Sequence, residues 1–234
     1  MIVQDIRSPS ATSPSCRALC DIPTSAVEDL EIFSDIIINV DNSLFERYEK
    51  MYADKINRII SLYKENNIKV KKGLSDKQIK LAQEYYNVVF PQDFEELLAT
   101  IRPVQSFYDW SDFSKKNVAL LNEKLAWPVE GALFDVENNN FWLKSWGEKP
   151  SEIEERLLTA KNHMEMVPKL IPVMGHRYIS SEPNEVGNPI YSVYQMDIIF
   201  YGENIWDYFE IEFEKKKHSD IAYSKMKKYH FGMI

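Results

Sequence analysis

Two stretches in the first half of the chain decide the fold: residues 73–79 read Gly-Leu-Ser-Asp-Lys-Gln-Ile, and residues 90–98 read Phe-Pro-Gln-Asp-Phe-Glu-Glu-Leu-Leu. Ser75 is a suitable N-cap for one helix, and Pro91 suits the start of another, where its missing N–H costs nothing. Apolar residues follow each start at three- and four-residue steps, which is typical of amphipathic helices. We therefore expect two short helices that pack as an α-hairpin.

After residue 102 the pattern changes to short segments rich in β-branched and aromatic residues, separated by Gly, Pro and Asn. Such segments favour strands. The predicted strands are residues 131–136, 141–143, 169–173, 177–179, 190–194 and 198–201. Helices are expected at 151–166 and 203–214. Together these elements predict an α+β fold, with an antiparallel or mixed sheet of about six strands flanked by helices.

The rest of the chain is expected to add three segments to a folded domain at residues 70–214. Residues 1–40 include a Ser- and Pro-rich stretch and are expected to form a flexible leader. Residues 41–69 carry apolar residues at helical spacing and predict a helical extension. Residues 215–234 form a Lys-rich tail, which would either touch an anionic surface or simply solvate the end of a helix.

The charge of the chain argues for a basic partner. Its formal net charge is −8, and residues 70–213 carry 14 basic against 23 acidic side chains. This balance argues against a nucleic-acid-binding surface, which needs clustered Lys and Arg, although ordinary solubility would also explain it. No stretch of about 18 residues lacks charged or strongly polar groups, so no membrane span is expected. Cys16 and Cys20 precede the folded part, which favours a reducing cytoplasm.

No motif indicates an enzyme or a cofactor. The chain lacks a Gly-x-Ser-x-Gly elbow and a Gly-rich phosphate loop, and its four His residues stand apart from any catalytic spacing. Asp135, Glu137, Asp197 and His176 have no metal-ligand spacing. We therefore expect neither catalysis nor a bound metal or cofactor.

The stretch 175–178, Gly-His-Arg-Tyr, is the densest polar group among the predicted strands. His176, Arg177 and Tyr178 could grip a carboxylate or a peptide carbonyl of a partner. The same residues could instead form an internal network with backbone carbonyls and the carboxylates of Asp135 or Asp197. Strand alternation places His176 and Tyr178 on one face and Arg177 on the other, unless the strand ends or bulges there.

Five Trp residues offer large contact area, and we expect three to be core and two, Trp142 and Trp146, to be partly exposed. These two lie close to a polar run at 137–140, in which Asn138 and Asn139 predict a hairpin turn. The candidate partner-binding residues are Glu137, Asn140, Trp142, Trp146, His176, Arg177, Tyr178, Gln195 and Asp197.

The order of motifs over residues 73–213 resembles the SMI1/KNR4 family, also called the SUKH superfamily, in its bacterial-type branch. The resemblance begins with 73–79 and 90–98 and continues through further short motifs. These are residues 107–110, 125–131, 134–142, 145–147, 170–173, 175–178, 187–189, 192–195, 197–202 and 207–208.

This resemblance implies a non-enzymatic, protein-binding role. Bacterial relatives are similar to immunity proteins that bind and neutralise toxin domains, and the acidic charge suits a basic toxin. Fungal relatives resemble regulatory scaffolds in cell-wall synthesis and stress signalling, which is the alternative. Either role requires a protein partner rather than a small-molecule cofactor.

Overall fold

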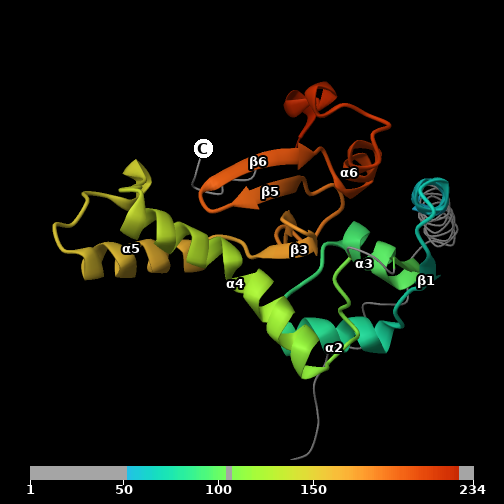
Figure 1. Ribbon diagram of the computed structural model, residues 1–234, viewed down its shortest axis with the longest axis horizontal. Coiled ribbons are helices and arrows are strands. Elements are labelled where there is room, and N and C mark those ends of the chain that lie inside the picture. The colour runs from blue at the N-terminus through green and yellow to red at the C-terminus, as the bar shows by residue number, and fades with distance from the viewer. Residues whose placement is uncertain (1–51, 104–106, 227–234) are drawn as a thin grey trace, which may run out of the picture. The chain divides into compact units, whose positions relative to one another are not determined.

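The computed structural model describes residues 52–103 and 107–226 (Figure 1). The chain divides into two compact units, Met1–Met51 and Tyr52–Ile234, and the described residues belong to the second. The predicted leader 1–40, the first part of the predicted helical extension (41–51) and the tail residues 227–234 lie outside the described residues.

The described residues have an α+β fold, as predicted. Residues 52–65 are helical. The further helices are α2 (Asp76–Tyr86), α3 (Gln92–Thr100), α4 (Lys115–Asn138), α5 (Ile153–Met166) and α6 (Ile205–Glu212). The strands are β1 (Val70–Lys72), β2 (Ile101–Pro103), β3 (Leu170–Met174), β4 (Arg177–Ser180), β5 (Ile190–Tyr194) and β6 (Asp197–Gly202). Short 3₁₀ turns are η1 (Lys144–Trp146), η2 (His218–Asp220) and η3 (Tyr223–Lys225).

The six strands form two antiparallel sheets rather than the single sheet expected. Strands β3 to β6 follow one another in a four-stranded sheet, and β1 pairs with β2 across the ends of the α2–α3 unit. The predicted α-hairpin is confirmed: Ser75 precedes α2, with its backbone N–H donating to Gln78 Oε1 at 3.0 Å, and Pro91 precedes α3. The three-residue strands β1 and β2 were missed because they are too short to show alternation.

Two of the predicted strands are wrong. Residues 131–136 belong to the 24-residue helix α4, and residues 141–143 form no regular element. The β-branched and aromatic residues there, with Gly131 and Pro128 as apparent breakers, favoured a strand. Burial instead follows helical spacing, because Leu121, Pro128, Ala132 and Val136 are buried at steps of seven and four residues.

Helix α4 continues through Pro128 because the sheet supplies the missing hydrogen bond. A proline inside a helix has no N–H for the carbonyl four residues earlier, which is that of Lys124. The Tyr178 hydroxyl donates to Lys124 O at 2.9 Å. Burial raises the pKa of Tyr178, so its hydroxyl stays protonated as a donor. The helix interior therefore tolerates the proline.

The main core joins helix 52–65 to α2, α3, α6 and residues of the four-stranded sheet. Its members from helix 52–65 are Ile56, Ile59, Leu62 and Tyr63. A bidentate pair at the surface connects the same helix to α6, with Arg58 donating to Glu210 at 2.7 and 2.9 Å. A second cluster lies between the C-terminal half of α4, η1 and α5, which runs beside α4 (Figure 1).

We predict that Tyr178→Phe lowers the free energy of unfolding by about 1–3 kcal/mol, since it leaves the carbonyl of Lys124 without a donor. Urea denaturation measures the change. In a Pro128→Ala background the helix regains its own N–H, so the same substitution should cost less. Tyr194→Phe, at a 63% exposed tyrosine, is the control and should change little. An equal cost of Tyr178→Phe in both backgrounds would contradict this role.

Candidate functional site

One face of α4 carries three apolar and three acidic side chains in a regular order. Leu120, Trp127 and Phe134 follow one another at seven-residue steps, and a glutamate stands three residues after each of them. We call this set the α4 stripe, and it consists of Leu120, Glu123, Trp127, Glu130, Phe134 and Glu137. Seven residues are nearly two helical turns, so all six lie on one side of the helix.

Five of the six residues of the α4 stripe are exposed, and the sixth, Trp127, is half-buried against the four-stranded sheet. Leu120 is 39% exposed and Phe134 is 47% exposed, and the three glutamates are also exposed. Glu123 pairs with Lys124 at 2.8 Å, whereas Glu130 and Glu137 have no ion pair within the described part of the chain. A merely solvated helix face carries polar residues. The exposed Leu120 and Phe134, with the half-buried Trp127 between them, make this face more apolar than a merely solvated one.

A pocket of about 530 Å³ adjoins the α4 stripe and shares Trp127 with it. We call it the Trp127 pocket. Its walls come from α4 and from the four-stranded sheet near the β3–β4 turn, and they include Trp127, His176, Tyr178, Tyr194, Asp197 and Ile199. The structure therefore brings together three of the predicted binding residues: His176, Tyr178 and Asp197.

The floor of the Trp127 pocket is aromatic and its mouth is open. The Lys124 ammonium lies 4.7 Å from the centroid of the Trp127 ring. The Trp127 indole N–H is buried and has no hydrogen-bond partner among the described residues. Tyr194 and Ile199 are 63% and 47% exposed. An apolar side chain would suit the exposed aromatic and aliphatic part of this surface.

His176 sits in the tight turn between β3 and β4. Partial burial, together with the neighbouring guanidinium of Arg177, lowers the pKa of His176. A residue outside the four-stranded sheet stabilises this turn, because the Tyr108 hydroxyl donates to Gly175 O at 2.7 Å. His176 is therefore neutral at pH 7 and can both donate and accept a hydrogen bond.

Arg177 does not line this pocket, in line with the predicted alternation along the strand. Its guanidinium lies 3.4 Å from the Tyr201 ring centroid, donates to Ser192 Oγ at 2.7 Å and is 3.9 Å from a Glu212 carboxylate oxygen. Its carboxylate neighbour is thus Glu212 of α6, and neither Asp135 nor Asp197. Arg177 serves the internal network rather than a partner.

Gln195 forms the tip of the β5–β6 hairpin, which rests on α4. A side chain at position 131 would place its Cβ 2.7 Å from Gln195 Cα, so only glycine allows this approach. Beside it, Met196 N–H donates to the Asp135 carboxylate at 2.9 Å. Gln195 thus contacts α4 through its backbone and does not line the Trp127 pocket.

The binding residues predicted after α4 were expected beside a hairpin turn, but the chain there forms the end of α4 and the turn η1. Asn138 ends α4 and Asn139 caps it, so no hairpin turn forms, although Asn140 does have a positive φ of 55°. Trp146 is buried, with 8% exposure, and stacks on His163. The expectation that Trp146 is partly exposed is wrong, because η1 folds it between α4 and α5.

Trp142 is half-buried, and its indole N–H donates to Gly147 O at 2.9 Å. Trp110 and Trp146 are the fully buried tryptophans, and Trp127 and Trp206 are half-buried like Trp142. The core therefore takes two of the five, rather than three. Of the four predicted binding residues between 137 and 146, Glu137 alone belongs to the α4 stripe.

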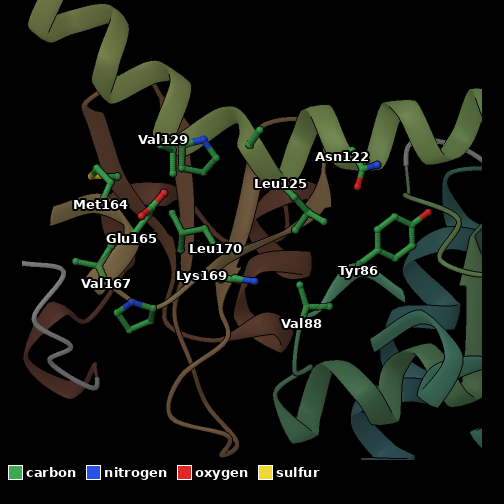
Figure 2. A pocket seen from close by; sticks show the side chains of 13 residues that line it. Tyr86, Val88, Asn122, Leu125, Val129, Met164, Glu165, Val167, Lys169 and Leu170 are labelled. Carbon is green, nitrogen blue, oxygen red and sulfur yellow. The ribbon is translucent and has the colours of Figure 1, made fainter. Parts of the chain in front are cut away.

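A second hollow lies on another side of α4 (Figure 2). Its volume is about 370 Å³, and its walls are mainly apolar, with Leu125 and Val129 from α4, Met164 from α5, and Val88, Val167 and Leu170 from connecting segments and β3. Lys169 crosses nearby and donates to Asn87 O at 2.7 Å. None of the predicted binding residues lines this α4–α5 groove.

Within residues 52–103 and 107–226, no three His, Cys, Asp or Glu side chains gather in a way that could hold a metal ion. Asp135 already accepts from Met196 and Asn139. None of the helices in these ranges is long and apolar enough to cross a membrane.

Part of the Lys-rich tail pairs within the molecule. Lys215 lies 3.0 Å from Glu65, and Lys216 lies 2.8 Å from Glu203 and 2.6 Å from Asp207. These contacts hold the tail against helix 52–65 and α6. They favour an internal role for Lys215 and Lys216.

The α4 stripe is hidden in the sequence because the β-branched and aromatic residues of 131–136 favour a strand. Once residues 115–138 are treated as one helix, the pattern apolar-x-x-Glu stands out at 120, 127 and 134. A search for a seven-residue period across Pro128 would have found it.

We predict that Gly131→Ala lowers the free energy of unfolding by up to about 2 kcal/mol, although alanine is the better helix former by about 1 kcal/mol. The new methyl group collides with the backbone of Gln195, and such overpacking costs about 1–3 kcal/mol. Thermal or urea unfolding provides the measurement. The reverse change at an exposed site of the same helix, Ala119→Gly, reports the propensity alone. Stabilisation by Gly131→Ala would show that the hairpin tip does not rest on α4.

We also predict that His176 titrates below the ordinary value of about 6.5. As the pH falls below about 6.5, the imidazole of the unfolded chain binds a proton before the imidazole of the folded protein does. Acidification therefore lowers the free energy of unfolding at this site. An NMR titration of the imidazole protons measures the pKa. A value at or above 6.5 in the folded protein would contradict the prediction.

Comparison with known proteins finds no relative of this chain. No protein-family model, no curated protein sequence and no solved structure matches the chain. The resemblance of residues 73–213 to the SMI1/KNR4 family stays a prediction from the order of its motifs. The α4 stripe and the Trp127 pocket are accordingly the features from which a function can be inferred.

Proposed function

We propose that the protein is a non-enzymatic binding module that captures a basic protein through the α4 stripe and the Trp127 pocket. The observation that carries this proposal is the alternation of exposed apolar and acidic side chains along α4. The apolar residues would bury area against the partner, and the glutamates would select its charge.

The energetics of protein interfaces support this assignment. Tryptophan at the centre of a patch is the residue type most often found to dominate binding energy, and Trp127 lies at the middle of the α4 stripe. Glu130 and Glu137 are exposed carboxylates without an ion-pair partner among the described residues. A basic partner would supply those partners and would associate faster because of the opposite potential.

The chemistry of the pocket favours binding over catalysis. The Tyr178 hydroxyl is held by a backbone carbonyl, and the Arg177 guanidinium donates to Ser192 and lies against the Tyr201 ring. His176 contacts Arg177. Tyr178 and Arg177 are therefore occupied within the fold, and the exposed lining residues are Gly175, His176, Tyr194, Asp197 and Ile199.

The resemblance to the SMI1/KNR4 family gives the partner its class. We propose an immunity-type protein of the cytoplasm, which binds a basic toxin domain and masks it. Binding to the α4 stripe would neutralise the toxin by covering its basic surface, without any chemical step.

The alternative is a regulatory scaffold in cell-wall synthesis or stress signalling. The α4–α5 groove favours it, because a scaffold needs a second contact surface, and the groove lies on another side of α4 from the stripe. Two partners bound at the same time, one of them displaced by substitutions in the groove, would support the scaffold.

We predict that the triple variant Glu123→Gln, Glu130→Gln, Glu137→Gln binds the partner at least tenfold more weakly than the unaltered protein at low salt. The partner to be tested is any toxin domain encoded beside this gene, in purified form, and calorimetry measures its Kd. The amides keep the size of the side chains and remove three charges, so raising the salt should shrink the difference.

The matched control removes the same number of charges elsewhere: Glu152→Gln, Glu154→Gln, Glu155→Gln, at exposed residues around the start of α5. It should bind within about twofold of the unaltered protein if the position of the charge decides. Equal weakening by both triple variants would mean that net charge alone attracts the partner. Absence of any complex, together with no protection of cells that express the toxin, would refute the immunity role.

A further inference from the structure

The spacing within the α4 stripe restricts the shape of what can bind it. The apolar-x-x-Glu unit recurs three times with a period of seven residues, from Leu120 to Glu137. At 1.5 Å per residue, equivalent groups stand about 10.5 Å apart, and the whole stripe is about 26 Å long. A partner that satisfies all three units must repeat its own chemistry at the same interval.

A helix meets this requirement and an extended strand does not. A helix lying along α4 presents residues of one kind every seven positions at the same interval of about 10.5 Å. A strand would cover that distance in about three residues, and an odd number of residues turns the side chain to the opposite face. The period therefore selects a helical partner.

Charge excludes several other occupants. In an antiparallel pairing of two copies, Glu123 would lie against Glu137 and Glu130 against its own equivalent, and like charges across an interface are repulsive. An anionic membrane or a nucleic acid would be repelled for the same reason. A helix with Lys or Arg at the positions that face the glutamates would supply cations to Glu130 and Glu137.

We infer that the partner presents an amphipathic helix of about 18 residues, with an apolar and a basic residue each repeated every seven positions, to the α4 stripe. This inference rests on the proposed function and specifies how the basic partner is recognised. The middle apolar residue of that helix lies over Trp127, where Tyr194 and Ile199 of the adjoining pocket extend the contact.

Two synthetic peptides of identical composition test the inference against the full chain. The first is a helix-forming peptide of three heptads, with Leu at one position and Lys three residues later in each heptad. The second contains the same residues in an order that breaks the seven-residue period. We expect the first to bind at least tenfold more tightly by calorimetry, and to become helical by circular dichroism.

Variants of the protein locate the contact. Phe134→Ala and Glu130→Lys should each weaken the first peptide at least fivefold. Leu158→Ala, which removes a 60% exposed leucine on α5, should leave it unchanged. Equal binding of the two peptides, or equal binding by all three variants, would overturn the inference, as would no binding of either peptide.

The outcomes separate this inference from the proposed function. If both peptides bind alike and the triple Glu→Gln variant binds neither, the stripe captures basic partners without recognising a helix. In that case the proposed function stands and the inference fails. If the toxin domain itself does not depend on the stripe, both fail. A dimer of the protein in light scattering that Phe134→Glu dissolves would identify a second copy as the occupant instead.

Discussion

The hydrogen bond between the Tyr178 hydroxyl and the carbonyl of Lys124 is the contact on which the rest of the described structure depends. Pro128 would otherwise leave that carbonyl unsatisfied inside the protein, where an unpaired acceptor is costly. With the bond in place, α4 runs unbroken over 24 residues. The first half of α4 can then pack on the main core while the second half packs on α5, and the six residues of the α4 stripe fall on one continuous face.

The β5–β6 hairpin contacts the C-terminal half of α4. Its tip meets α4 at Gly131, and Met196 donates to Asp135 one turn further on. The sheet thus contacts α4 at two places, through Tyr178 and through the hairpin tip, on either side of Trp127 in the sequence. This double attachment fixes the wall of the Trp127 pocket relative to the stripe. A binding surface supported in this way loses little conformational entropy when a partner docks.

Helices and strands with caps, apolar spacing or β-branched residues of their own could be predicted from the sequence. The remaining elements depend on contacts between residues that are far apart in the sequence. Caps and apolar spacing were sufficient for α2, α3, α5 and α6, and β-branched residues were sufficient for β3 to β6. The strand prediction for residues 131–136 was wrong because Gly131 and Pro128 are residue types that usually interrupt a helix. Helix α4 tolerates them through contacts with Gln195 and Tyr178, which lie far away in the sequence. The same error hid the α4 stripe, and Trp146 became core because η1 folds back onto α5. His176 and Asp197 line one pocket because both pair with the end of β5, His176 with Val193 and Asp197 with Tyr194.

The local arrangement of charge is more informative about the partner than the net charge is. Residues 70–213 carry nine more acidic than basic side chains, but many of the charges pair internally, as Lys216 does with Glu203 and Asp207. Screening reduces the influence of an exposed charge beyond about 8–10 Å at physiological salt. Glu130 and Glu137 stand about 10.5 Å apart along the helix, so each acts on the group directly opposite rather than as part of a general field. Under the proposed function, selectivity for a basic partner would therefore depend on matching positions, which a seven-residue repeat provides and a uniformly acidic surface does not.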